Sequence, residues 1–451
     1  MQRIDAEFPD RTPQGIAGVL ARLVTDGVLA PGDRLPTVRE IASVLSVSPA
    51  TVSAAWQALA RAGVIVSRGR AGTFVRETPR DWLTPRIQGM SGGGEPRLDL
   101  SLGTPDPALL PALGPAFSRV SPRAEAGRYR DLPVLPALGS LLEAMWPSRA
   151  ETITVVDGAL DGIDRTLGQL VRFGDRVAVE SPGFPHFLDL IEVLGAEPVP
   201  LALDSEGVTP ASLAAALARR PVAVLVQPRA QNPTGASMTT DRAHELARVI
   251  AASRDGDRVV VVEDDHSGPI ADAPDVTLGT WLPEQVVHVR SFSKSHGPDL
   301  RLAAVGGPAR IVERVVARRM LGPAWTSRLL QAVLVDLLTD PASAEVVRAA
   351  RRAYRDRAGV LADALGARGV DVGRPDGLNL RLPVADERAA LVHLAAAGIG
   401  VAAGTPFVVG AESAAPFVRV TAGVVAEGAA AIASVLAEAA ALSEGERAAR
   451  P

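Results

Sequence analysis

The chain has 451 residues, of which 47% are hydrophobic and 22% charged, with a formal net charge of −4 and no cysteine. This length predicts two or three domains, and the lack of cysteine excludes disulfides and thiolate metal sites. Because the sequence has no apolar run of roughly eighteen residues, no signal-peptide pattern and no paired histidines, we expect a cytoplasmic protein without a membrane span or a metal.

Residues 1–76 predict a small DNA-binding domain. Apolar residues at helical spacing predict helices over 13–28, 37–45 and 49–62, with Ser48 as the N-cap of the last. Short strands over 64–67 and 73–76 would form a β-wing after this helix-turn-helix. Between Arg34 and Arg76 there are six arginines against one acid, a local charge of +5 that suits phosphate contacts. A dimerisation module with a basic face is the alternative.

The stretch from Gly27 to Val75 resembles the winged helix-turn-helix domain of GntR-type regulators. It keeps the family patterns GxLxPGxxLPxxRE and VSxxTV together with a glycine-rich wing. Pro49 departs from the family, which usually has arginine there, so one expected base or phosphate contact is missing. The resemblance implies that double-stranded operator DNA is bound by Arg34, Thr37, Arg39, Ser48, Ala50, Thr51, Arg68 and Arg70.

Residues 77–98 are rich in proline and glycine without periodicity, which predicts a linker. From 99 to 451, valine-rich runs at 177–179, 222–226, 259–262 and 287–289 alternate with helical stretches. This alternation predicts a main α/β domain on a mainly parallel sheet, with its large part at about 130–310 and its small part in the C-terminal remainder. Functional side chains should follow the C-terminal ends of its strands.

Lys294 is the single lysine among 47 basic residues. Arginine can replace lysine in an ion pair but not as a nucleophile, because a guanidinium stays protonated. A buried lysine can lose its proton and form a Schiff base with an aldehyde. Ser291 and Ser293 precede Lys294 and Arg301 follows it, so phosphate-binding groups lie near the amine. Pyridoxal 5′-phosphate carries both an aldehyde and a phosphate; a lysine retained by chance is the alternative.

The Ser-x-Ser-Lys…Arg pattern resembles the cofactor-lysine region of fold-type I aminotransferases. A glycine turn, a loop aromatic, an Asn-Pro-Thr-Gly turn and an acidic strand end precede it in the family's order. Each of these features alone has an ordinary structural explanation, and only their order along the chain indicates the family. The resemblance implies that the cofactor is bound by Gly158, Ala159, Leu160, Phe184, Asn232, Asp264, His266, Ser291, Ser293 and Arg301, and by Tyr129 of a neighbouring subunit.

Within this resemblance, Asn232 would bind the ring oxygen, and Asp264 rather than Asp265 the pyridine nitrogen. Arg419 would take the α-carboxylate of an amino-acid or amine effector, and Tyr129 implies a homodimer. His266 stands where the family usually has tyrosine; its N–H could bond the same ring oxygen, or the site could be tuned differently. Residues 134–135 replace a usual glycine, so the entry loop is expected to differ.

A winged helix followed by an aminotransferase-like domain resembles the MocR subfamily of GntR regulators over nearly the whole chain. The resemblance implies a transcription regulator that senses pyridoxal phosphate, or an amino compound reacting with it, through a Schiff base at Lys294. Effector exchange there would favour one of two conformations. An active aminotransferase with an accessory N-terminal domain stays open, because Asp264, Lys294 and Arg419 would suffice for transamination. A cofactor-free scaffold conflicts with the retained lysine.

Overall fold

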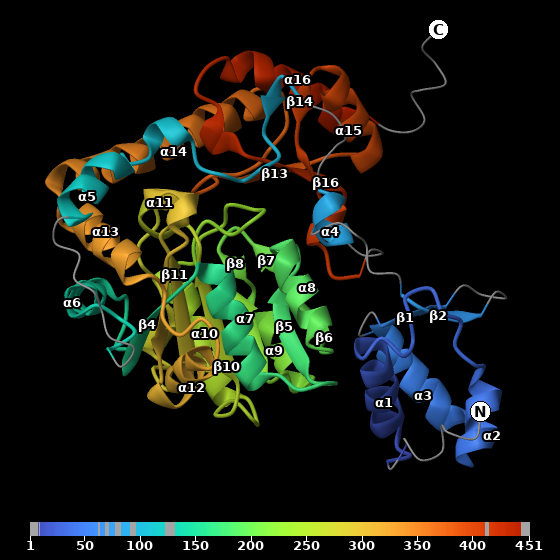
Figure 1. Cartoon of the computed structure of the whole chain (residues 1–451). Helices are drawn as coiled ribbons and strands as arrows, with labels where there is room; N and C mark the ends of the chain where they lie inside the picture. Colours follow the sequence, from blue (N-terminus) through green and yellow to red (C-terminus); the bar gives the residue numbers. More distant parts are fainter. Residues whose placement is uncertain are drawn as a thin grey trace, which may run out of the picture. The chain divides into compact units, whose positions relative to one another are not determined.

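The computed structural model describes residue 8 and residues 10–61, 64–67, 72–76, 83–90, 96–121, 131–410 and 415–442. Among these residues no helix is both long and apolar enough to cross a membrane. The N-terminal part of the chain is blue in Figure 1.

The N-terminal part consists of three helices and a β-hairpin. Its elements are α1 (Pro13–Thr25), α2 (Val38–Leu45), α3 (Pro49–Arg61), β1 (Ile65–Ser67) and β2 (Thr73–Val75). Each helix starts after a hydroxyl residue, Thr12, Thr37 or Ser48, that accepts a first-turn backbone N–H. The first helix ends at Thr25 rather than at residue 28, because Gly27 adopts a positive φ of 72° that turns the chain.

A single apolar core holds these elements together. The faces expected from the sequence are buried, including Ile16 of α1, Leu45 of α2 and Trp56 of α3. The hairpin is antiparallel, and an isolated antiparallel bridge joins Arg34, before α2, to Phe74 of β2. The expected helix-turn-helix with a β-wing is therefore what the described residues form.

A seven-stranded, mainly parallel sheet forms the centre of the C-terminal part. The strand order is β4-β12-β11-β10-β9-β5-β6. Their bounds are β4 (Thr152–Val156), β5 (Arg176–Glu180), β6 (Glu197–Leu201), β9 (Ala223–Val226), β10 (Val260–Asp265), β11 (Val286–Ser291) and β12 (Ala303–Gly307). Strand β10 pairs in parallel with β9 and β11, whereas β12 is antiparallel to β11 and β4. The expectation of a mainly parallel α/β sheet is confirmed, with β12 as an antiparallel strand.

Helices cover this sheet, which explains why β9, β10 and β11 are buried along their whole length. Helices α9 and α10 share a core with β9 and β10, and α7 packs against β10, β11 and β12. The helices of this part are α4 (Pro85–Gln88), α5 (Leu113–Val120), α6 (Pro136–Met145), α7 (Ala159–Leu170), α8 (Pro185–Val193), α9 (Pro210–Ala218), α10 (Thr240–Ala252), α11 (Ser293–His296), α12 (Ala309–Met320) and α13 (Arg328–Thr339).

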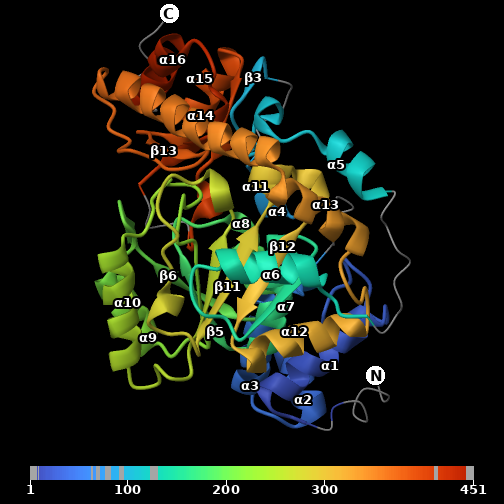
Figure 2. The same cartoon turned by 90° about the vertical axis from the view of Figure 1, so that its left-hand side faces the viewer.

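The small part at the C-terminal end has its own core. Figures 1 and 2 show α16 beside the long helix α14, and α15 packs against α16. These three helices share an apolar core with β13 and β16 of the sheet β13-β16-β15. Strand β3, at the start of the C-terminal part, pairs with β14. The bounds are β3 (Leu98–Asp99), α14 (Pro341–Gly366), β13 (Leu380–Pro383), α15 (Glu387–Ala396), β14 (Ile399–Gly400), β15 (Ala402–Ala403), β16 (Phe417–Val420) and α16 (Ala429–Ala441). A separate hairpin, β7 (Leu203–Asp204) and β8 (Gly207–Val208), lies outside this small part.

Candidate functional site

Lys294 lies in α11, directly after β11 ends in the middle of the large sheet. Its Nζ donates a hydrogen bond to the backbone oxygen of Gly103, which is 191 residues earlier in the chain. Burial and, to a lesser extent, the charge of Arg419 lower the pKa of Lys294 to about 8, with the charge of Asp264 opposing them. Near neutral pH a substantial fraction of this amine is therefore neutral, and the neutral amine is the form that attacks an aldehyde.

Arg419, on β16, is the second cation of the site and is only 1% exposed. Its guanidinium donates to the backbone oxygen of Ser101 and to Oδ1 of Asn379 (3.3 Å), and it lies 5.6 Å from the ring centre of Phe407. Burial lowers the pKa of Arg419 to about 10, with the charge of Asp99 opposing. Its Nε has no hydrogen-bond partner among the described residues. A buried guanidinium bonded mainly to neutral oxygens is well suited to binding an anion.

The segment Ser101–Gly103, which we call the 101–103 segment, connects these two cations. Arg419 donates to its first carbonyl and Lys294 to its last. Gly103 has a positive φ of 63°, and a Cβ there would collide with the Arg419 guanidinium, so the position requires glycine. Its N–H donates to Oγ1 of Thr421 (2.9 Å), which fixes the segment against the end of β16. Sequence reasoning missed this segment because no local motif marks it.

Asp264 and Asp265 end β10, and their side chains leave opposite faces of the sheet. Asp265 accepts hydrogen bonds from Arg229 and Arg290, whose charges hold the pKa of Asp265 well below its usual range despite burial. Asp264 accepts a hydrogen bond from Gln227 (2.8 Å) and interacts electrostatically with Lys294. Burial raises the pKa of Asp264 to about 7. Asp264 is therefore the aspartate available at the Lys294 site.

Two buried oxygens of the residues expected to bind the cofactor ring have no hydrogen-bond partner among the described residues, Oδ1 of Asp264 and Oδ1 of Asn232. Both residues are tied to Gln227, because Gln227 donates to Asp264 and accepts the Asn232 backbone N–H (2.8 Å). Buried polar atoms without partners are rare and costly. A pyridoxal ring carries a nitrogen that can be protonated and a hydroxyl group, both of which can donate to these oxygens, so this pair fits a pyridoxal ring.

The glycine turn after β4 lies against the guanidinium of Arg301. A Cβ added to Gly158 would come 2.9 Å from the Arg301 Nη2 atom, so the two residues are in contact. Ala159 and Leu160 form the first turn of α7, where backbone N–H groups favour an anion. The turn and the arginine therefore fit a phosphate. The Ser291 hydroxyl accepts the Ser293 N–H (3.2 Å) and so helps to form the turn before Lys294.

His266 lies 2.9 Å, through Nε2, from the backbone oxygen of Ala230. Because a carbonyl oxygen only accepts, Nε2 carries the proton. Burial lowers the pKa of His266 to about 4, so the ring is neutral and has no second N–H. The His266 N–H therefore donates to the backbone oxygen of Ala230 and not to the ring oxygen of the cofactor, which is one of the two expectations for this residue. Phe184 is half-buried in the loop between β5 and α8, and Tyr129 lies outside the described residues.

The residues expected to contact DNA lie on the surface of the N-terminal part. Arg34, Thr37, Arg39, Ser48 and Ala50 are exposed and Thr51 is half-exposed. The Ser48 and Thr51 hydroxyls lie 2.8 Å apart. Ser48 also caps α3, and Thr37 caps α2 in a capping box with Glu40. Arg68 and Arg70 lie outside the described residues.

Comparison with known proteins gives two family matches. Residues 12–75 match the family of bacterial regulatory proteins described as gntR family, and residues 95–436 match aminotransferase class I and II. The second family is pyridoxal phosphate dependent, which implies that cofactor.

Individual relatives cover both parts of the chain. The vitamin B6 salvage pathway transcriptional repressor PtsJ of Salmonella typhimurium is 35% identical over 415 residues, covering 89% of this chain and 93% of that protein. The regulator TauR of Rhodobacter capsulatus is 30% identical, covering 79% and 81%. The α-aminoadipate aminotransferase LysN of Thermus thermophilus has the same fold, with a TM-score of 0.67 at 22% identity over 78% of this chain and 92% of that structure.

The two family matches, in this order along one chain, agree with the helix-turn-helix and the aminotransferase fold described above. The chain therefore belongs to the GntR family of transcriptional regulators, to its MocR type, in which an aminotransferase class I and II domain follows the helix-turn-helix domain.

Proposed function

We propose that this regulator senses pyridoxal 5′-phosphate, alone or combined with an amino compound, and converts occupancy of the Lys294 site into a change in operator binding. The observation that carries the proposal is the 101–103 segment, whose carbonyls accept hydrogen bonds from both Lys294 and Arg419. The similarity to PtsJ, named a repressor of vitamin B6 salvage, supports a role in vitamin B6 metabolism.

Pyridoxal 5′-phosphate, when bound, supplies an aldehyde that condenses with primary amines and a ring that withdraws electrons. Lys294 would offer the amine, since its lowered pKa leaves part of it neutral. Arg301 and the first turn of α7 would bind the phosphate, and Asn232 would bind the ring oxygen. Asp264 would face the ring nitrogen through its unpartnered Oδ1, and Arg419 would bind the carboxylate of an amino-acid effector.

These roles suggest how ligand binding at the Lys294 site would affect the DNA-binding domain. A ligand that engages Lys294 and Arg419 competes with the carbonyls of Ser101 and Gly103 for the same N–H groups. Loss of those hydrogen bonds frees the 101–103 segment, which follows the 77–98 stretch expected to be the linker from the DNA-binding domain. A ligand shifts a conformational equilibrium only through different affinities for the two states, and this competition provides such a difference.

Absorption spectroscopy tests the cofactor assignment. Protein incubated with pyridoxal 5′-phosphate and then dialysed should keep a visible band at roughly 420 nm. Lys294→Ala should abolish the band, and Lys294→Arg should do the same while keeping the positive charge. A band that survives in both variants would refute the role of Lys294.

Gel-shift experiments test the regulatory assignment. The probe is the intergenic DNA next to the protein's own gene, with a shuffled duplex of equal length as control. We expect binding to the native duplex to change when pyridoxal 5′-phosphate is added to wild-type protein but not to Lys294→Ala. Equal affinity for both duplexes, or the same response in both proteins, would contradict a ligand-controlled regulator.

A second function, transamination, is supported by the presence of Asp264, Lys294 and Arg419 in one electrostatically coupled site. It predicts steady formation of a new amino acid from an amino-acid donor and an oxo-acid acceptor. Repeated turnover without any effect of the cofactor on DNA binding would favour the enzyme. A stoichiometric reaction coupled to altered DNA binding would favour the sensor.

A further inference from the structure

Gln227 follows β9 and forms hydrogen bonds with two of the residues expected to contact the cofactor ring, Asp264 and Asn232. Its Nε2 donates to Oδ2 of Asp264 (2.8 Å), and its Oε1 accepts the backbone N–H of Asn232 (2.8 Å). Gln227 is 4% exposed and Asp264 is 3% exposed, so water does not replace these bonds readily.

The orientation of the Gln227 amide is fixed by the backbone. A backbone N–H can only donate, so the atom facing Asn232 must be the amide oxygen. The amide nitrogen must then face Asp264, and Oδ2 of Asp264 must accept. Any proton that Asp264 carries is thereby directed to Oδ1, the oxygen without a partner among the described residues.

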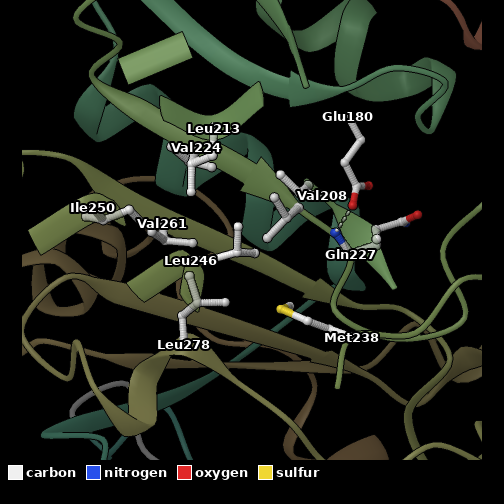
Figure 3. Close-up of a pocket in the computed structure, with 12 residues that line it drawn as sticks. Glu180, Val208, Leu213, Val224, Gln227, Met238, Leu246, Ile250, Val261 and Leu278 are labelled. Carbon is white, nitrogen blue, oxygen red and sulfur yellow. Dashed lines mark hydrogen bonds between the residues drawn. The ribbon is translucent and has the colours of Figure 1, made fainter. Parts of the chain in front are cut away.

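A buried carboxyl holds Gln227 in place from the other side. Oε1 of Glu180 accepts the Gln227 backbone N–H (3.1 Å), the hydrogen bond drawn in Figure 3. Oε2 of Glu180 accepts Nε2 of Gln231 (3.1 Å), and Gln231 is itself oriented because its Oε1 accepts the Thr234 N–H (3.1 Å). Apolar side chains such as Val208 and Met238 line the pocket beside Glu180 and Gln227.

We propose that Gln227 is a positioning residue that holds Oδ2 of Asp264 as an acceptor and leaves Oδ1 to exchange a proton with the ring nitrogen of the bound cofactor. This inference rests on the proposed function, because it requires a pyridoxal ring beside Asp264. Glu180 supports the arrangement by anchoring the main chain of Gln227 and the side chain of Gln231.

The physical reason concerns the basicity of the carboxylate. A hydrogen bond donated to a carboxylate stabilises its charged form. With Gln227 donating to Oδ2, Asp264 holds a proton less tightly, and the shared proton stays on the ring nitrogen. Without that donor the carboxylate is more basic, and the proton moves from the nitrogen toward Oδ1.

The test compares Gln227→Glu with Gln227→Leu. Ionised glutamate keeps an acceptor for the Asn232 N–H but removes the donor to Asp264, whereas leucine removes both groups at any pH. Gln285→Glu is the matched control, because Gln285 donates its amide only to the backbone oxygens of Gly256 and Val259. Each protein is loaded with pyridoxal 5′-phosphate labelled with ¹⁵N in the ring, and the ring-nitrogen chemical shift is recorded at one pH.

We expect a protonated ring nitrogen in wild-type protein and in Gln285→Glu. Both Gln227 variants should shift the signal toward neutral pyridine, with the larger shift in Gln227→Glu, while the visible band at roughly 420 nm persists. A wild-type signal in Gln227→Leu, or an unprotonated ring in wild-type protein, would overturn the proposal although cofactor is bound. No band in wild-type protein would refute the proposed function, and this inference with it.

Discussion

The lowered pKa of Lys294 predicts an unusual pH dependence of cofactor uptake. An ordinary lysine with a pKa of 10.5 is about 0.1% neutral at pH 7.5, whereas a pKa of about 8 leaves about 24% neutral. Because only the neutral amine attacks the aldehyde, the rate should be about 200-fold higher than for an ordinary lysine in the same pocket. The rate should rise with pH and level off above about pH 8.

The assay is stopped-flow absorbance of cofactor-free protein mixed with pyridoxal 5′-phosphate between about pH 6 and pH 10.5. Dividing each rate by that of Nα-acetyl-lysine, after the latter is corrected for its own neutral-amine fraction, removes the cofactor's own titration. Arg419→Gln should move the protein's midpoint upward, because the charge of Arg419 contributes to lowering the pKa of Lys294. A midpoint near 10.5, or one unaffected by Arg419→Gln, would refute this account of the site.

Three further predictions concern single positions. Arg39→Ala should weaken operator binding similarly for all sequences and lower the slope of log affinity against log salt by about one, as measured by fluorescence anisotropy; an unchanged slope would exclude a phosphate contact. Thr37→Ala removes the capping box with Glu40 and should cost about 1 kcal/mol of unfolding free energy in urea, whereas Thr37→Ser should cost little. Gly103→Ala places a Cβ against Arg419 at a positive φ. Thermal unfolding should therefore show a destabilisation of at least about 1 kcal/mol, and spectral titration should show weaker binding of an amino acid. Wild-type behaviour in both measurements would contradict the role of the 101–103 segment.

Several features could be predicted because local sequence fixes them. The capping of α2 and α3 depends on hydroxyl residues next to the helices that they start. The buried strands appear as valine-rich runs because covering helices require apolar residues on both faces. Lys294 could be singled out because no other residue of the chain has a side-chain primary amine. The domain boundaries and the Tyr129 homodimer remain predictions.

The tertiary structure decided what local sequence could not. The sequence contains two adjacent aspartates whose side chains leave opposite faces of the sheet. Arg229 and Arg290 bind Asp265 on one face, so Asp264 is the aspartate at the Lys294 site. No motif marks Gly103 or Gln227, because their roles depend on partners that lie 191 residues away at Lys294 and 37 residues away at Asp264. The sequence by itself determined the family, the fold class and the position of the single lysine amine, since these depend on residue types and their order. The fold alone decided which carbonyls hold that amine and Arg419, and which oxygen of Asp264 is free, because hydrogen-bond partners are fixed by positions in space.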